Sequence, residues 1–440
     1  MGNGVLTEPR WGAAQGVAPA RWLPILGGLA ALTPFLLCAS SFRKLFWFGD
    51  EWDQLKEFHQ AGVWRYVTAT FAENFVPLFK AMWLLLLAAG RGSYLVVLAM
   101  LWITHALNVL LLGTILRRIG AGAAGIAVAL VWAGLPASNI ETLGWTVQWS
   151  AVLALSFFLV AVLQFLRFAG RGGNDATALG LLAAASLASS LSFSRGVLSG
   201  CAIAFTCSIP IGIRGLRPRD RALAAAAALL PALLVAAIIA SSVQANHQRV
   251  LQHGVAAKAA EFAAHFFLLN PLQALWGLEP RDGLLYFLGA IKLAIYGIAL
   301  LRARGTGRWL VWMSLVLDTA NAVLVGIGRY HTGLAAAVGS RYQYVPLFCL
   351  APAVAMVMDG IIDLLRSVPP LARAVTVALP LLLAWLIASP WPEQMRSWSG
   401  WRGMDVRLIL MTKRDATPLP YVAGVSTAEA AALRDDFHLH

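Results

Sequence analysis

Three carboxylates stand within four positions of the segment 48–55, as Asp50, Glu51 and Asp53, with aromatic residues on both sides. Two neighbouring acids take different roles when one of them loses water or faces a cation, and one can then serve as a general base. Acidic residues are also common in the first turn of a helix, where they interact favourably with its N-terminus. The cluster therefore indicates either a proton-accepting site or the solvated start of a helix.

Cationic side chains that could bind phosphate occur in three other short segments. Arg329-Tyr330 and Arg341-Tyr342 lie close together in the sequence, and Arg195 lies in a separate turn. A guanidinium binds phosphate through two parallel hydrogen bonds and stays charged at any working pH. These arginines could instead pair with lipid headgroups or with the acids near Asp50. The candidate substrate ligands are Arg341, Tyr342, Arg329 and Tyr330, with Arg195 and Lys80 in reserve.

Polar residues inside apolar runs form a third group. His105 and Asn108 share one face of a predicted helix. Such groups either hold membrane helices together or belong to a site. Structural packing is the simpler interpretation for this pair, and His105 is kept as a substrate-binding candidate. Lys292 and Asp318 both fall near the middle of apolar runs, so we expect them to pair, with Asn321 as a possible third member.

The composition places these residues in a membrane protein. Of 440 residues, 59% are apolar and 12% are charged, whereas soluble domains have about 45–50% apolar and about 25% charged residues. These values exclude an ordinary soluble domain, and they also exclude a disordered chain. The net charge of +13 would suggest nucleic acid in a soluble protein. Here the arginines stand in short loops between apolar runs, so no nucleic-acid partner is expected.

Eleven apolar segments are long enough to be predicted as membrane spans. We therefore expect an all-α polytopic membrane protein, with the N-terminus inside and the C-terminus outside. The segments are 22–41, 93–116, 121–137, 144–167, 177–192, 196–213, 221–242, 283–301, 309–328, 342–362 and 371–389.

Loop charge decides the orientation, because inner loops are rich in Lys and Arg. The five loops assigned to the inside contain Arg117, Arg118, Arg167, Arg171, Arg214, Arg217, Arg219, Arg221, Arg302, Arg304, Arg308, Arg366 and Arg373. The loops assigned to the outside contain Asp50, Glu51, Asp53, Glu73, Glu141, Glu261, Glu279 and Asp282.

The whole chain, 1–440, is predicted to form a single transmembrane domain with three outer segments. These are a long first loop (42–92), a second loop (243–282) and a short C-terminal tail (390–440). Interfacial helices are expected over 77–89 and 255–269, although 77–89 as a span of its own is a weaker alternative. In the tail, Ser426 and Glu429 have the spacing of a capping box.

This arrangement resembles the GT-C superfamily of polytopic glycosyltransferases, and most of all the protein O-mannosyltransferases and lipid A aminoarabinose transferases. The tail is too small for the large soluble domain of oligosaccharyltransferases, which disfavours that subfamily. The resemblance rests on the acidic pair Asp50-Glu51, the segment Pro77-Leu-Phe-Lys80, a helix with His105 and Asn108 ending in Arg117-Arg118, Pro136, Trp145, and Ser340-Arg341-Tyr342.

The resemblance implies an inverting transfer of sugar from a polyprenyl-phosphate donor to a lipid, glycan or protein acceptor at the outer, periplasmic face. By position, Asp50 would be the base and Glu51 the second acid. Some members use a divalent metal, but this sequence has no second acidic cluster, so no metal cofactor is expected. The bias towards Arg, Ala and Gly suggests a bacterial inner membrane, where membrane lipids surround the chain.

Two other classes of membrane protein would also show many spans and buried charges. A transporter or flippase would show repeats and charges along the midplane, whereas the polar clusters here gather at the outer face. A non-catalytic envelope assembly protein would tolerate replacement of Asp50 and Arg341.

Overall fold

The computed structural model describes residues 22–71, 74–209, 211–213, 215–241, 254–276, 283–412, 415–419, 422 and 424–440. Within these residues the chain is all-α, as the sequence predicts. Arg214, Glu73, Glu279 and Asp282, which the orientation argument uses, lie outside the described residues.

The first half contains α1 (Trp22–Leu37), α2 (Ala39–Phe42), α3 (Asp50–Thr68), α4 (Pro77–Ala89), α5 (Tyr94–Arg118), α6 (Ala123–Gly134), η1 (Ala137–Asn139), α7 (Ile140–Gly144), η2 (Thr146–Gln148), α8 (Trp149–Gly170), α9 (Ala176–Ser192), α10 (Gly196–Ser208) and α11 (Pro218–Ser241). The second half contains α13 (Val255–Leu269), α14 (Leu272–Trp276), α15 (Leu284–Arg302), α16 (Gly305–Arg329), η4 (Tyr330–Thr332), η5 (Leu334–Val338), η6 (Ser340–Tyr342), α17 (Tyr344–Leu364), η7 (Leu365–Ser367), α18 (Pro369–Ala388), α19 (Trp391–Ser399), η8 (Gly400–Met404), α20 (Asp405–Thr412) and α21 (Thr427–Asp436).

Each of the eleven predicted segments coincides with a helix. Among the described residues, seven helices are long and apolar enough to cross a membrane, and an eighth span arises if the bent pair Ala123–Gly134 and Ala137–Gly144 counts as one. The helices α1, α9 and α10 are shorter apolar helices. The count of eleven spans and the N-inside orientation therefore stay predictions.

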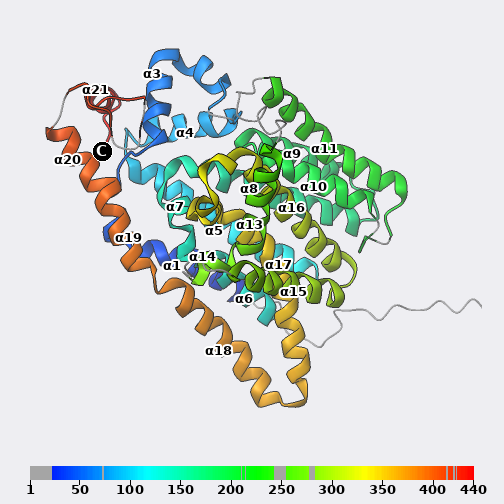
Figure 1. Cartoon of the computed structure of the whole chain (residues 1–440). Coiled ribbons are helices and arrows are strands. Elements are labelled where there is room, and N and C mark those ends of the chain that lie inside the picture. Colours follow the sequence, from blue (N-terminus) through cyan, green and yellow to red (C-terminus); the bar gives the residue numbers. More distant parts are fainter. Residues whose placement is uncertain are drawn as a thin grey trace, which may run out of the picture.

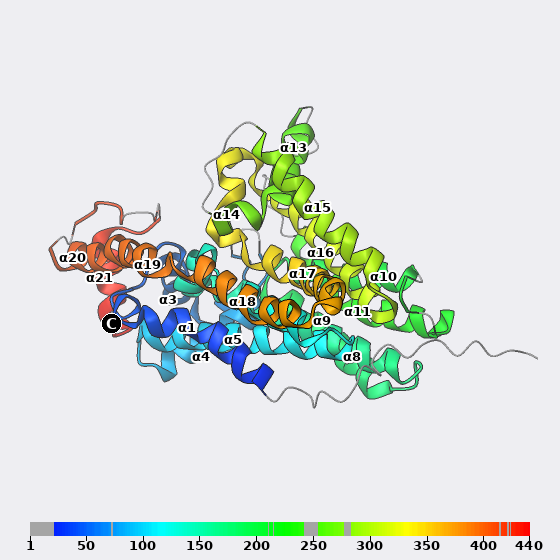
Figure 2. The same ribbon diagram turned by 90° about the horizontal axis from the view of Figure 1, so that it is seen from below.

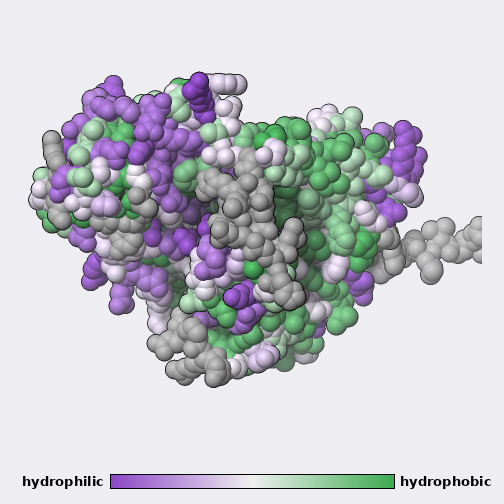
Figure 3. Space-filling model, turned by 45° about the horizontal axis from the view of Figure 1, so that its top comes forward, coloured by the Kyte–Doolittle hydropathy of each residue, from purple (hydrophilic) through white to green (hydrophobic). Residues whose placement is uncertain are grey.

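The helices form a bundle with a long arm on one side (Figure 1), where α18, α19 and α20 follow one another along its edge. Figure 2 shows α13 and α14 standing out from one side of the bundle. In Figure 3, hydrophilic residues gather over the part that carries α3, while hydrophobic residues cover the part that carries α11. A large exposed hydrophobic surface of this kind is typical of a part that contacts lipid.

The bend after α6 shapes the end of the bundle on which the site lies. Because Pro136 has no backbone N–H to donate, α6 ends at Gly134, and the chain turns by 41° into the segment Ala137–Gly144. The indole N–H of Trp391 donates to the carbonyl of Leu135 at 2.7 Å, which ties the C-terminal tail to this bend.

The pairing of Lys292 with Asp318 is confirmed. The two side chains are fully buried, with 2.6 Å between Nζ and Oδ2. The hydroxyl of Tyr296 donates to the same carboxylate at 3.2 Å. Asn321 is not part of the pair, because its side-chain amide has no hydrogen-bond partner within the described part of the chain.

Candidate functional site

Asp50 is the first residue of α3 and follows a turn that only glycine adopts easily. Gly49 has φ +58°, and a Cβ there would press against the ring of Trp145. The Asp50 side chain is open to water and has no hydrogen bond or ion pair among the described residues. Surrounding protein nevertheless displaces enough water to raise the pKa of the Asp50 carboxyl, an effect that the charges of Arg341, Arg329 and Arg402 oppose. Asp50 is therefore an available carboxylate in a cationic field.

Glu51 lies in a different environment although it is the next residue. Its side chain is fully buried. One oxygen accepts from the backbone N–H of Phe48 at 2.7 Å, and the other accepts from the backbone N–H of Thr146 at 2.9 Å and contacts the Thr146 hydroxyl. Burial raises the pKa of Glu51 to about 8. Glu51 thus joins the start of α3 to η2, and its role as the second acid stays a prediction.

The guanidinium groups of Arg195, Arg329 and Arg341 form a cluster that has no carboxylate partner in an ion pair among the described residues. The Tyr342 ring lies between two of them, with its centroid 5.0 Å from the Arg341 guanidinium carbon and 5.4 Å from that of Arg195. The charges of Arg329 and Arg341 both act on Arg195. None of the three has an ion pair within the described segments. An excess of unpaired positive charge in a partly buried site favours a bound anion.

A cavity of about 310 Å³ leads from this arginine cluster between α10, α11 and α16. Its polar end contains Asn74, Ser194, Arg195 and Arg329. The remaining walls are apolar apart from a backbone glycine, and they come from Phe193, Val197, Leu198, Ala236, Ile239, Ala240, Leu324, Val325 and Gly328. A cavity with one cationic end and apolar walls suits a phosphate joined to a hydrocarbon chain.

Tyr330 packs beside this cluster. Its ring lies against a small apolar group that includes Phe262, Phe266 and Tyr342, and it meets the His331 ring edge to face at 5.6 Å. The structure thus brings together five of the predicted residues, which are Asp50, Arg329, Arg341, Tyr342 and Arg195, with Tyr330 at the edge of the group.

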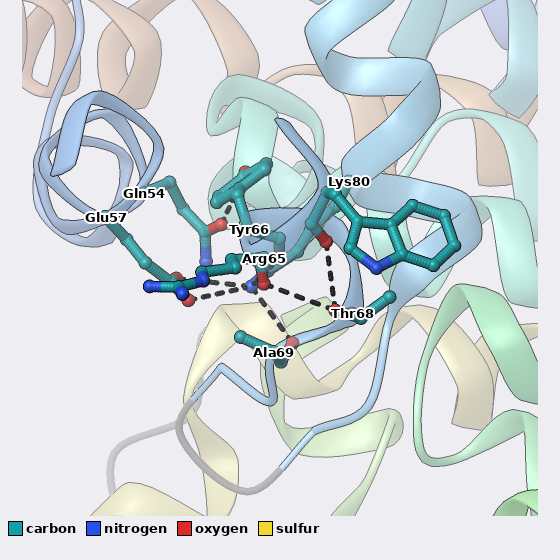
Figure 4. Close-up of polar contacts among 8 residues, drawn as sticks. Gln54, Glu57, Arg65, Tyr66, Thr68, Ala69 and Lys80 are labelled. Atoms are coloured by element: carbon teal, nitrogen blue, oxygen red, sulfur yellow. Dashed lines mark hydrogen bonds and ion pairs between the residues drawn. The ribbon is translucent and has the colours of Figure 1, made fainter. Parts of the chain in front are cut away.

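Lys80 belongs to a separate, structural network (Figure 4). It is fully buried, its ammonium lies 3.2 Å from a carboxylate oxygen of Glu57, and it donates to the carbonyls of Tyr66 at 2.9 Å and Ala69 at 3.1 Å. With these partners engaged, Lys80 ties α4 to the far end of α3. The role of Lys80 as a reserve substrate ligand stays a prediction.

His105 is likewise engaged inside the bundle. Its Nδ1 lies 3.0 Å from the Tyr344 hydroxyl and its Nε2 lies 3.2 Å from the Gly134 carbonyl oxygen. Asn108 donates to the same hydroxyl at 3.0 Å and to the carbonyl of Val152 at 2.9 Å. Both residues are fully buried. These contacts fit helix packing, and a role of His105 in binding substrate stays a prediction.

Two residues of the site were missed by the sequence reasoning. Glu141 accepts from Nη2 of Arg402 at 3.0 Å through one oxygen, and from the Ser340 hydroxyl at 3.0 Å and the Arg341 backbone N–H at 3.1 Å through the other. Glu141 thereby holds the segment that carries Arg341. The signal for Arg402 in the sequence is an arginine directly after Trp401 and four residues after Trp398.

The next question is whether the described residues could bind a metal ion. Within the described part of the chain, no group of three or more His, Cys, Asp or Glu side chains could hold one ion. Glu51 is committed to Phe48 and Thr146. The expectation of a metal-free site stays a prediction.

Comparison with solved structures finds a similar fold in an archaeal protein. The apo form of the Archaeoglobus fulgidus oligosaccharyltransferase has a TM-score of 0.50 and 14% identity, over 96% of this chain and 60% of that chain. The fold is shared. This chain spans about 60% of the length of its neighbour.

Two further structures of the same oligosaccharyltransferase match less well. The complex with Zn and sulfate has a TM-score of 0.48 at 14% identity, over 92% of this chain and 58% of that one. The complex with an inhibitory peptide and a dolichol-phosphate has a TM-score of 0.47 at 13% identity, over 92% and 60%. No model of a known protein family matches this chain, and no curated protein matches it.

Proposed function

We propose that this chain is a membrane glycosyltransferase of the GT-C type that uses a polyprenyl-phosphate-linked sugar. The fold shared with an oligosaccharyltransferase supports the class. The proposed place of reaction is the outer, periplasmic face of a bacterial inner membrane. The acceptor is a hydroxyl group of a lipid, a glycan or a protein.

One observation carries the proposal: the available carboxylate of Asp50 lies in the field of Arg341 and Arg329, and Arg329 also lines the apolar cavity. In the proposed reaction, an acceptor hydroxyl is hydrogen-bonded to Asp50 and its oxygen attacks the anomeric carbon of the sugar. The bond from that carbon to the phosphate oxygen breaks, and its electron pair leaves with the phosphate. The acceptor proton passes to Asp50. Attack from the side opposite the phosphate inverts the anomeric carbon.

The departing phosphate gains negative charge, which requires cations fixed in advance. Arg341 and Arg329 are the proposed partners because both act on Asp50 electrostatically. Arg195 contacts the same Tyr342 ring as Arg341 and also lines the cavity. The hydrocarbon chain of the donor would lie between α10, α11 and α16. Since the described carboxylates form no set of metal ligands, no step is assigned to a metal.

The test compares Asp50→Asn with the matched control Asp53→Asn, which removes a charge one turn away on the same helix. The purified chain in liposomes is given a panel of radiolabelled polyprenyl-phosphate-linked hexoses and pentoses together with an envelope extract as acceptor. We expect the wild type and Asp53→Asn to move label out of the polyprenyl-phosphate fraction. Asp50→Asn should lose about 100-fold or more of this rate.

Two outcomes contradict the proposal. The first is a transfer rate that is the same in Asp50→Asn and the wild type. The second is a wild type that transfers label from no donor of the panel; label that crosses the bilayer still attached to its lipid would favour the flippase alternative.

A further inference from the structure

The guanidinium of Arg402 sits in an aromatic cage. Its central carbon lies 3.6 Å from the ring centroid of Trp398, 4.4 Å from that of Phe48, 4.6 Å from that of Trp401 and 5.1 Å from that of Trp145. The residue is 7% exposed. Aromatic faces attract a cation, and the attraction grows when water is excluded. We call these four rings the Arg402 cage.

Glu141 is the carboxylate that pairs with Arg402, at 3.0 Å from Nη2. The Nε and Nη1 groups are buried without hydrogen-bond partners in the described part of the chain. A buried charge with unsatisfied donors is costly unless its surroundings compensate. Arg402 therefore depends on the cage and on Glu141 for its stability, and removing it must disturb both.

The cage is built around the turn that presents Asp50. Phe48 is two residues before Asp50, and the indole N–H of Trp145 donates to the Phe48 carbonyl at 3.1 Å. A Cβ at Gly403 would overlap the carbonyl oxygen of Lys44, so the Arg402 turn is pressed against the chain that leads into this segment. That turn is a short π-helix, Gly400–Met404, a feature often found at functional sites.

Glu141 connects the same arginine to the anion-binding side. Its second oxygen holds the Ser340 hydroxyl and the Arg341 backbone N–H. Arg402 thus contacts two segments of the site. Phe48 belongs to the turn that presents Asp50, and Glu141 accepts from the backbone of Arg341. Arg402 also acts directly on the Asp50 carboxyl through its charge.

We infer that Arg402 is a positioning residue of the C-terminal tail, which fixes Asp50 relative to Arg341. This inference rests on the proposed function for its meaning in catalysis, but its geometry can be measured without turnover. If Arg402 has this role, the C-terminal tail belongs to the site. Replacing Arg402 should change the titration of Asp50, which a purely structural anchor would not do.

The test measures how Asp50 titrates by labelling protonated carboxyls with a water-soluble carbodiimide and glycinamide across a pH series. The labelled peptide containing Asp50 is quantified by mass spectrometry in the folded protein. In Arg402→Gln the labelling midpoint should move up by about half a pH unit or more, because a cation near the carboxyl is lost. Arg402→Lys keeps the charge and should move it less.

Arg407→Gln is the matched control. Arg407 lies on the same tail, over the ring of Phe46 at 4.8 Å, and donates to the Leu45 carbonyl. It does not act on Asp50, so its replacement should leave the midpoint in place. In the transfer assay the acidic limb of the pH profile should follow the labelling midpoint, and Arg402→Gln should lose roughly 10- to 100-fold of the rate.

The outcomes separate this inference from the proposed function. A wild type that transfers sugar, with the same Asp50 midpoint in Arg402→Gln as in the wild type, overturns the role of Arg402 and leaves the function standing. A shifted midpoint in a protein that transfers nothing supports the placement of Arg402 and rejects the enzyme. If Arg402→Gln does not fold, Arg402→Lys decides through hydrogen exchange at the Arg341 amide, which should be faster than in the wild type. Unchanged exchange would reject the inference.

Discussion

At the scale of single residues, surroundings separate the two adjacent acids at the start of α3. Asp50 and Glu51 have the same functional group and follow each other in the chain. Successive helix residues point about 100° apart, so one carboxyl faces the open site while the other turns into the protein towards Thr146. The sequence locates the acidic pair, but which member is buried depends on a contact with a residue far along the chain.

The environment of Glu51 predicts a dependence of stability on pH. Its pKa is raised by burial from 4.5 to about 8, so between these values the folded protein holds a proton that the unfolded chain releases. This contribution is present below about pH 4.5 and is lost as the pH rises towards 8. In Glu51→Gln, which cannot titrate, the loss should be absent.

The measurement is the melting temperature in detergent from pH 4.5 to 8.5. We expect the wild type to lose several degrees relative to Glu51→Gln over this range. Because the Glu51 carboxyl has no exposed surface, the transfer rate per folded molecule should be nearly retained. Parallel melting curves would show that Glu51 is ionised in the folded protein.

At the scale of elements, Lys80 is the link between α4 and the far end of α3. We expect Lys80→Met to lower the free energy of unfolding by about 1–3 kcal/mol, since the carbonyls of Tyr66 and Ala69 lose their donor. The KM for the donor should not change, because the Lys80 ammonium is engaged by Glu57 and by the carbonyls of Tyr66 and Ala69.

The matched control for Lys80→Met is Lys56→Met, which breaks a partly exposed pair between α3 and Glu429 at 3.1 Å. Such pairs contribute about 0–1 kcal/mol, so this change should be milder. Thermal unfolding gives the first comparison and donor kinetics the second. A raised donor KM in Lys80→Met at unchanged stability would return Lys80 to the substrate site.

The elements themselves were largely predictable from the sequence. The bounds of α4 and α13 match the predicted interfacial helices, and the capping box at Ser426 forms as its spacing predicts. Local signals such as a proline at the first helical position are visible in a sequence. Burial of a polar side chain is not, because its partners come from elsewhere: the His105 partner Tyr344 is 239 positions away. The sequence therefore does not show that Lys80 and His105 have these buried partners.

At the scale of the whole molecule, the site combines parts from the full length of the chain. Asp50 comes from the first loop, Arg195 from the turn before α10, Arg341 from the segment before α17, and Arg402 from the tail. The cavity is lined by residues of α10, α11 and α16, and hydrophobic residues cover the part of the surface that carries α11 (Figure 3). A donor could therefore keep its hydrocarbon chain among apolar walls while its phosphate meets the arginines, without any part of it crossing a polar surface.

This arrangement makes the cavity walls testable apart from the charged residues. Ala236→Trp would fill the space between α10, α11 and α16, and we expect the KM for a long-chain donor to rise by about tenfold, the effect of losing one good apolar contact region. A donor with a short prenyl chain should be affected less, because it needs less of the cavity. The control is Leu234→Trp on the same helix, where the side chain is 60% exposed and outside the cavity. The measurement is the KM for donors of both chain lengths in the two variants. A KM that rises equally for the two donors, or that rises in Leu234→Trp as well, would mean that the hydrocarbon chain lies elsewhere.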